Sequence, residues 1–587
     1  MSIDTPSNEP TDDLVLGWRV GRDLGTEWWD HAGTRVQVPP PPHVLETVER
    51  DAVAMHTAIV AQSGSGKSFF LGRYLEEVLL KTRARVTVFD PNADFRQIAT
   101  TDVNVWPVNG KVGDPPTDWV TTGNKRHPLT HEATPQEFAE PWSEIKVVVM
   151  GQKPKGEDKS PIQDMAFHWP RLTPHFLLVG DGAVRDRGGV IALHELVQAG
   201  HELWQLLAAK SSPGPGSKGV QVLTVPEWLK PPMNARKAGD EKNSQTLAEN
   251  LVEDIQKRLN YKEPNPPDHQ IAQATSEFMR AFMMAAKVDT STHEAYVKLY
   301  DHYQGRGLLV EDDEKMKTAC GLHDDTDIRV LDMPSFRETE DRDRAVLFLL
   351  DMIWNMARSA WQAATRDKLA NSSRVPHLIV MDEAHNLVPA ERPDSPVRAE
   401  IRDRIKTIAG EGRKYGLFLV IVTQRPDKLD PQVLGECGNQ AIMLMRSILV
   451  LEDCRKLLAV ELGPEEQAII KEKFCSGFAR LSGKWATPPR IIFAAARRTV
   501  ASGADLVARE WSQPRERVKK RIKLVRSRPG PAAGGDPGSP PTPPTTSGPS
   551  PKPAGGPPSV FPPAAQDSEP KITSHSDTPA VPPPKSS

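Results

Sequence analysis

The sequence predicts an α/β fold in which a mostly parallel sheet is flanked by helices. Three apolar runs carry this prediction: Ala58–Val60, the run that ends at Met381, and Leu417–Val422. Each is continuous in the way expected for a strand buried on both faces, and each is followed directly by small or polar residues. Because the carboxyl ends of parallel strands meet at one edge of a sheet, where open α/β sheets bind ligands, the residues after these runs are the candidate site.

The first run leads into the Gly- and Ser-rich stretch Ala61–Ser68, AQSGSGKS, and then into a helix-period segment. Such a loop resembles a phosphate-binding loop, although Ala61 stands where Gly is usual. Backbone N–H groups of Ser63, Gly64, Ser65 and Gly66 and the start of the helix would cradle a β-phosphate. Lys67 would reach the β- and γ-phosphates, and Ser68 would hold Mg²⁺. The alternative is a Gly/Ser loop with an unrelated Lys.

The second run ends in two acids, Asp382 and Glu383. A strand that ends beside a phosphate loop can place Asp382 at the water shell of Mg²⁺ and Glu383 beside the γ-phosphate. Glu383 would then polarise the attacking water, so the pair predicts hydrolysis in addition to binding. The alternative is a strand end with two solvated acids.

The third run is preceded by Arg413 and followed by Gln424. We expect Gln424, at the carboxyl end of the strand, to sense the γ-phosphate or to orient water. We place Arg413 on the turn before the strand, as a candidate arginine finger that stabilises transition-state charge in a neighbouring subunit. A surface Arg in a salt bridge is the alternative.

Taken together, these motifs resemble the HerA/FtsK-type P-loop motor ATPases, and the HerA branch most closely. The resemblance rests on AQSGSGKS, FDPNADF (89–95), VLDMPSF (330–336), IVMDEAH (379–385) and the run from Glu411 to Gln440. It implies a RecA-like P-loop NTPase core of the additional-catalytic-glutamate (ASCE) class that uses ATP and Mg²⁺. It also implies a homo-oligomeric ring, typically a hexamer, that moves double-stranded DNA, often beside a nuclease in end processing or phage defence. Asp382 and Ser68 would hold the metal, and Arg413 would act in trans.

The expected organisation divides the ATPase core into two blocks separated by a long insert, because over 200 residues are too many for a loop. In the insert we expect strands at Ile145–Met150, Phe176–Val179 and Val220–Val225, and helices at 190–210, 246–259 and 271–286. The second half reads helical, as in HerA-type proteins. The expected segments are a disordered N-terminus (1–13), a short β-rich segment (14–54), the ATPase core (55–100 and 325–500), the insert (101–324), a basic helical segment (501–528) and a disordered Pro/Gly/Ser-rich tail (529–587).

Composition indicates a soluble cytoplasmic protein without a membrane segment. Charged residues make up 26% of the chain, and no apolar run approaches the roughly 20 residues that span a bilayer. The four cysteines, which show no metal-binding spacing, are expected to be reduced and buried: Cys320, Cys437, Cys454 and Cys475.

The function predicted from these features is an ATP-hydrolysing ring motor acting on double-stranded DNA. The basic stretch Arg509–Arg528 could meet phosphates, although a solvated helix or a brace onto a neighbouring subunit is equally consistent with its composition. The alternative function is a nucleotide-gated switch or scaffold that recruits a protein effector without moving DNA. Nucleotide binding without turnover is a third interpretation, and it would require a mispositioned Glu383.

Overall fold

The computed structural model of the protein describes most of the chain up to residue 502. The described residues are 13–20, 27–31, 34–38, 44–101, 105–106, 110–111, 135–154, 156, 160–178, 186–211, 223–238, 241–264, 268–366, 374–474, 476–495 and 497–502. The expected disordered N-terminus, the basic stretch Arg509–Arg528, the Pro-rich tail and Cys475 therefore lie outside the described residues, apart from Asp13.

A 12-stranded sheet organises the fold, with the order β10-β9-β11-β6-β12-β13-β5-β14-β15-β16-β1-β4. Neighbouring strands run parallel from β10 to β14 and antiparallel from β14 to β4. The predicted α/β class with a mostly parallel sheet is thereby confirmed. The strands of this sheet are β1 (Leu14–Val20), β4 (Val44–Val48), β5 (Thr57–Val60), β6 (Arg85–Asp90), β9 (Val147–Gly151), β10 (Ile162–Asp164), β11 (Ile328–Asp332), β12 (His377–Met381), β13 (Leu417–Thr423), β14 (Asn439–Met443), β15 (Phe478–Gly483) and β16 (Arg490–Ala494).

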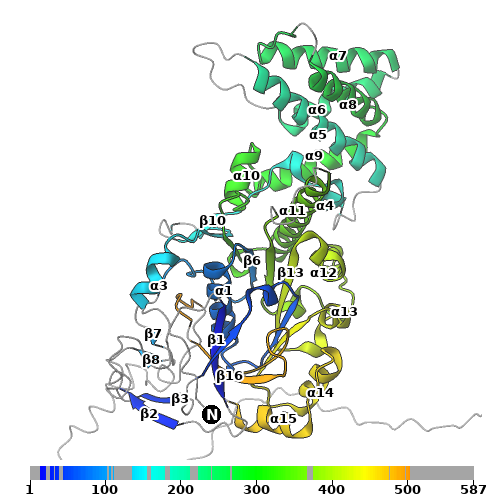
Figure 1. The fold of residues 1–587 in the computed structure, drawn as a ribbon. Coiled ribbons are helices and arrows are strands. Elements are labelled where there is room, and N and C mark those ends of the chain that lie inside the picture. The colour runs from blue at the N-terminus through cyan, green and yellow to red at the C-terminus, as the bar shows by residue number, and fades with distance from the viewer. Residues whose placement is uncertain are drawn as a thin grey trace, which may run out of the picture. The chain divides into compact units, whose positions relative to one another are not determined.

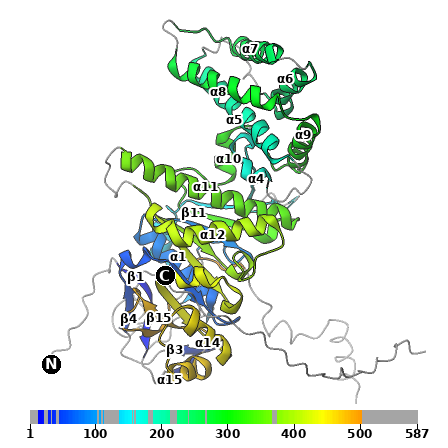
Figure 2. The ribbon, with the colours of Figure 1, turned by 90° about the vertical axis from the view of Figure 1, so that its right-hand side faces the viewer.

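Helices cover both faces of the sheet, and the central strands alternate between the two cores. In β13, Phe418, Val420 and Val422 join one core, in which α1 (Lys67–Lys81) and α3 (Pro135–Trp142) pack. Leu419 and Ile421 join the other core, with α11 (Thr339–Arg366), α12 (Pro396–Tyr415) and α13 (Pro431–Gly435). Figure 2 shows α11 and α12 side by side on that face. Because every residue of β13 is buried, the run reads as continuously apolar.

The segment between β6 and β11 contains strands as well as helices. β9 pairs with β11, and β10 pairs with β9, so the first half of the expected insert adds two parallel strands to the main sheet. The strand expected at Ile145–Met150 is confirmed as β9. Two short hairpins, β2 (Glu27–His31) with β3 (Thr34–Val38) and β7 (Val105–Trp106) with β8 (Gly110–Lys111), form separate two-stranded sheets.

Two of the strands expected in this segment are wrong. Phe176 and Leu177 belong to helix α4 (Pro174–Leu178), in which Pro174 occupies the first position, where its fixed φ favours a helix. Val225 begins helix α6 (Val225–Ala238), and residues 220–222 lie outside the described residues. The Glu227 carboxylate accepts hydrogen bonds from the backbone N–H and the hydroxyl of Thr224, at 2.7 and 2.8 Å. This local contact starts a helix where the apolar run alone indicated a strand.

The remaining helices of the insert agree with their apolar periodicity. Those expected at 190–210, 246–259 and 271–286 are present as α5, α7 and α8, and they pack on one another together with α6 and α9 (Figure 1). The helices are α5 (Arg187–Lys210), α7 (Glu241–Arg258), α8 (His269–Ala285), α9 (Thr290–Gly305) and α10 (Asp313–Ala319) in the insert, and α14 (Ile448–Leu457) and α15 (Pro464–Ala468) after β14. None of the helices in the described residues is both long and apolar enough to cross a bilayer.

Candidate active site

The phosphate-type loop connects the end of β5 to the start of α1. Gly64 and Gly66 adopt left-handed backbone conformations, with φ of 77° and 88°, which Gly accepts without the steric cost of a Cβ. Ala61, which replaces the usual Gly, is buried, and its N–H donates to the Thr423 carbonyl at 3.1 Å, which extends the β5–β13 pairing. The departure from the pattern at Ala61 is therefore accommodated within the sheet.

The loop is braced by the segment before β15. The Gly477 N–H donates to the Ser65 carbonyl at 2.9 Å, and a Cβ on Gly66 would lie 3.1 Å from the Ser476 hydroxyl. The Ser65 hydroxyl is buried and has no hydrogen-bond partner in the described residues. A buried hydroxyl without a hydrogen-bond partner costs free energy. A bound ligand with polar atoms would supply the partner that the Ser65 hydroxyl lacks.

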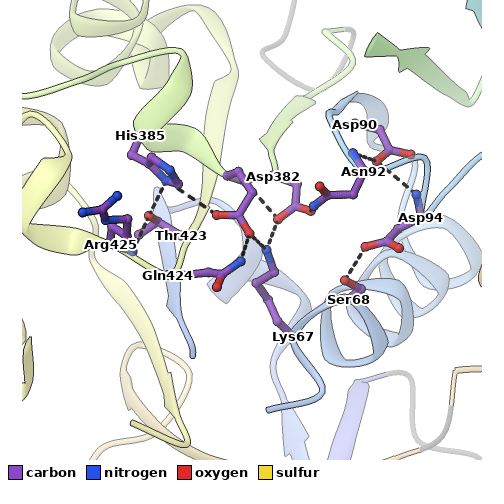
Figure 3. A network of polar contacts seen from close by, with 11 residues as sticks. Lys67, Ser68, Asp90, Asn92, Asp94, Asp382, His385, Thr423, Gln424 and Arg425 are labelled. Carbon is purple, nitrogen blue, oxygen red and sulfur yellow. Dashed lines mark hydrogen bonds and ion pairs between the residues drawn. The ribbon is translucent and has the colours of Figure 1, made fainter. Parts of the chain in front are cut away.

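Three strands bring the predicted polar residues together at one edge of the sheet, because β13 lies between β5 and β12 (Figure 3). The Lys67 ammonium donates to Asp382 Oδ1 at 2.7 Å and also contacts Glu383 Oε1. The Gln424 amide donates to the same Glu383 oxygen. Lys67, Asp382, Glu383 and Gln424 thus form one contact network, although they are separated by up to 357 positions in the chain, from 67 to 424.

Glu383 occupies an unusual backbone conformation for a non-Gly residue. Its φ is 46° and its ψ is 48°, in the left-handed region, directly before the short helix η5 (Ala384–Asn386). Such a conformation costs of order 1 kcal/mol or more and is concentrated at functional sites. The second carboxylate oxygen, Oε2, is buried and has no hydrogen bond from any described residue, with His385 Nδ1 at 3.5 Å. The strained backbone therefore presents a carboxylate with an open acceptor position.

The charged groups in the site shift one another's pKa values. Burial acts to lower the pKa of the Lys67 ammonium, but the Asp382 and Glu383 carboxylates outweigh it and the pKa is raised. Burial raises the pKa of the Asp90 carboxyl to about 7, a rise that the backbone N–H of Phe95 opposes and the nearby charge of Asp382 increases. A single Lys faces several buried carboxyl groups, so the site favours an added divalent cation.

The segment after β6 supplies residues that the motif analysis did not identify as part of the site. The Ser68 hydroxyl donates to Asp94 Oδ2, and the Asn92 amide donates to Asp382 Oδ2 at 3.2 Å (Figure 3). Asp90 accepts hydrogen bonds from the backbone N–H groups of Asn92, Asp94 and Phe95, which fixes the turn that carries them. The signal was present in FDPNADF, since its acids follow a buried strand at the same edge.

Arg413 does not join this network in its own chain. It lies in the last turn of α12, not on a turn before β13 as the sequence suggested, because the helix continues to Tyr415 and ends at Gly416. Its guanidinium contacts the Met55 sulfur and lies 3.8 Å from a Glu436 carboxylate oxygen, at the amino end of β5. β13 has seven residues that rise about 3.3 Å each, so Arg413 and Gln424 lie about 20 Å apart at opposite edges of the sheet.

Comparison with known proteins finds similarity to HerA proteins over part of this chain. A family model described as the central domain of the helicase HerA matches residues 48–130. The DNA double-strand break repair helicase HerA of Sulfurisphaera tokodaii is 27% identical over 156 residues, which cover 26% of this chain and 30% of that protein. The HerA of Pyrococcus furiosus is 35% identical over 68 residues, 12% of this chain and 11% of that protein. The matched segments thus span less than a third of either relative.

Among solved structures, a bacterial conjugative coupling protein, TrwB, aligns with 78% of this chain and 89% of its own, at 12% identity and a TM-score of 0.33. The family match covers the segment that contains β5, the phosphate-type loop, α1 and β6. These matches agree with the HerA-like resemblance inferred from the motifs: the segment around the phosphate-type loop is similar to the HerA central domain and to the HerA proteins of two archaea.

Proposed function

We propose that this chain hydrolyses ATP at the carboxyl edge of its sheet and uses the reaction to move double-stranded DNA. The observation that carries the proposal is the convergence of Lys67 and Gln424 on one carboxylate oxygen of Glu383. A general base beside a Lys and an amide is the arrangement that phosphoryl transfer to water requires.

Several features of the site fit ATP and Mg²⁺. The orphaned Ser65 hydroxyl and the left-handed Gly64 and Gly66 suit a phosphate cradle made of backbone N–H groups. Ser68 and Asp382 would hold Mg²⁺, and Asp94 adds a carboxylate at the Ser68 hydroxyl. The ion would supply neutralisation of phosphate charge, and Lys67 would exchange its carboxylate partners for phosphate oxygens.

In this mechanism Glu383 accepts a proton from the attacking water. Its Oε2, to which no residue in the described part of the chain donates a hydrogen bond, provides the acceptor. Gln424 holds the carboxylate from the neighbouring strand and would orient the water, while His385 bonds the Thr423 hydroxyl and lines the far side of Glu383. When Lys67 turns to phosphate, Glu383 loses one donor and becomes a stronger base.

A ring is the second part of the proposal. Arg413 faces away from the site of its own chain, at the opposite edge of the sheet, and this position supports its use at a transition state in a neighbouring subunit. A homo-oligomeric ring, with six subunits as in the family it resembles, would place Arg413 of one copy at the site of the next. The relatives of this chain are named as DNA repair helicases, which supports double-stranded DNA as the substrate.

A nucleotide-gated switch or scaffold remains the second candidate, because it would use the same catalytic residues. A nuclease or another effector protein would then be the client of the ATP cycle. Some cations between Arg455 and Arg480 are engaged within the chain: Arg480 is buried and pairs with Glu466, and Arg455 pairs with Glu452. A DNA channel would therefore need other basic residues, which gives this second candidate its support.

The test is the steady-state ATPase rate of the full chain with and without linear duplex DNA. We expect DNA to raise the rate severalfold and Glu383→Gln to abolish hydrolysis while ATP still binds. Glu391→Gln, at an exposed position eight residues further on, is the matched control and should keep the wild-type rate. Hydrolysis that ignores DNA would favour the switch, and a Glu383→Gln variant that turns over normally would refute the assigned base.

A further inference from the structure

A second cluster of buried polar side chains lies where the insert meets the sheet. His168 follows β10 and precedes the short helix η2 (Trp169–Arg171), His201 lies on α5, and Asp313 is the first residue of α10. One ligand atom from each lies within 4.8 Å of the other two, and the three residues are between 3% and 9% exposed. Segments far apart in the sequence thus converge on one buried point.

His201 is the member that the protein leaves unsatisfied. It is 5% exposed, and neither ring nitrogen has a hydrogen-bond partner in the described residues. Its ring lies edge-on to that of His168, with the centroids 4.6 Å apart. A buried polar group without a partner costs about 1–3 kcal/mol, so a structure that keeps it usually supplies a partner from elsewhere.

Neighbouring side chains position the Asp313 carboxylate by hydrogen bonds, as is common for carboxylate ligands of metals. Oδ2 accepts a hydrogen bond from Arg171 Nε at 2.6 Å, and Oδ1 lies 2.6 Å from His168 Nδ1. The hydrogen bond from Arg171 to Oδ2 fixes the carboxylate so that Oδ1 lies on the side of His168. A metal-free ion triad of Arg171, Asp313 and His168 explains those three residues but leaves both nitrogens of His201 unexplained.

We propose that His168, His201 and Asp313 bind a divalent transition metal, with Zn²⁺ the ion that best fits. Two imidazole nitrogens and one carboxylate oxygen form a ligand set for Zn²⁺ and similar ions, whereas Mg²⁺ and Ca²⁺ prefer oxygen ligands alone. In a tetrahedral site the ligand atoms lie about 3.4 Å apart, so binding would need small movements of the three side chains. Water would complete the coordination.

The position of the cluster gives the ion a structural role. It would join α5 and α10 of the insert to the segment that leaves β10, a strand of the main sheet. Metal binding in such a site contributes directly to the stability of the fold. The proposal does not depend on nucleotide hydrolysis, since none of its residues belongs to the network around Lys67.

The test is titration of the metal-free full chain with Co²⁺ in excess Mg²⁺, which occupies sites made of oxygen ligands. We expect saturation at one equivalent, intense visible absorption from four-coordinate Co²⁺, and loss of that absorption on adding Zn²⁺. Elemental analysis of the zinc-loaded, dialysed protein should give one Zn²⁺ per chain. The absence of four-coordinate absorption from the wild-type protein would overturn the proposal without any variant.

Variants then assign the ligands. His201→Ala should lose the absorption and the bound zinc, whereas His269→Ala, at an exposed position on α8, should retain both. If His201→Ala fails to fold, His168→Gln serves in its place. Normal zinc content in folded variants of both His201 and His168 would contradict the assignment.

Discussion

At the scale of single residues, His194 links protonation to the integrity of the insert. It is fully buried on α5, its Nε2 lies 2.7 Å from the Leu172 carbonyl, and its Nδ1 lies 2.5 Å from the Tyr296 hydroxyl. The Tyr296 hydroxyl also accepts the Trp169 indole N–H at 3.0 Å. Burial lowers the pKa of His194 from 6.5 to about 4, so the folded protein holds this imidazole neutral.

The unfolding free energy should therefore fall as the pH falls from about 6.5 to about 4. In this window the unfolded chain takes up a proton at residue 194 and the folded chain does not, so acid favours unfolding. The shift corresponds to up to about 3 kcal/mol at the acid end. Urea unfolding at pH 7 and pH 4.5, followed by circular dichroism, measures the difference. The His194→Gln variant should show a smaller difference in unfolding free energy between the two pH values. The control His302→Gln, at an exposed position, should show the same difference as the wild type. Equal pH dependence in all three proteins would contradict the argument.

The convergence of the candidate site residues could be predicted because each directly follows a buried strand or lies in a loop of known pattern. Asp382, Glu383 and Gln424 follow apolar runs, and Lys67 lies in the Gly- and Ser-rich loop pattern. Asp94 and Asn92 were missed, because their contacts with Ser68 and Asp382 depend on a turn fixed by Asp90. The residue spacing of the FDPNADF motif does not indicate which way its side chains point.

At the scale of elements, α12 ends at a glycine whose backbone conformation is energetically unfavourable for other residues. Gly416 caps the helix in the left-handed region, with φ of 83°, and leads directly into β13. Gly410, inside the same helix, has ordinary backbone geometry, and an added Cβ there would meet no atom of the described residues within 4 Å. The two glycines therefore predict opposite responses to the same substitution.

Gly416→Ala should destabilise the protein by about 1 kcal/mol, because a Cβ disfavours the left-handed conformation. Gly410→Ala should stabilise it by roughly 0.5–1 kcal/mol, because Ala is the better helix former. Urea unfolding of the two variants beside the wild type gives both values. Destabilisation by Gly410→Ala, or no effect of Gly416→Ala, would refute this account of the helix end.

The sequence predicted the elements best where periodicity was long. α5, α7 and α8 agree with their apolar spacing, and β12 and β13 with their continuous runs. α4 and the start of α6 were mistaken for strands because a short apolar run is consistent with either a helix or a strand. At the start of α6, the contact between Thr224 and Glu227 is a local signal that favours the helix. The pairing of β9 and β10 with the main sheet is a long-range fact that local patterns do not contain.

At the scale of the whole molecule, the position of Arg413 requires a second copy of the chain if this residue takes part in hydrolysis. Arg413→Ala should then lower the ATPase rate by roughly 10³ without loss of ATP binding, as expected for an arginine finger. Arg358→Ala, at an exposed position on α11, is the control.

Mixing inactive variants separates action in trans from a structural effect. In a ring that contains both Arg413→Ala and Lys67→Ala subunits, some sites combine an intact loop with an intact Arg413, so hydrolysis should return. An Arg413→Ala protein that stays inactive in every mixture, although the subunits exchange, would place the role of Arg413 within its own chain.

The central claim is that ATP hydrolysis at Glu383 drives movement along double-stranded DNA. Displacement of a third strand from a triplex placed at a distance along a linear duplex measures this movement directly. The account predicts release of the third strand by the wild-type protein with ATP, and no release by Glu383→Gln or by the wild-type protein without ATP. A third strand that stays bound while the wild-type protein hydrolyses ATP on the same DNA would contradict the motor and leave the switch.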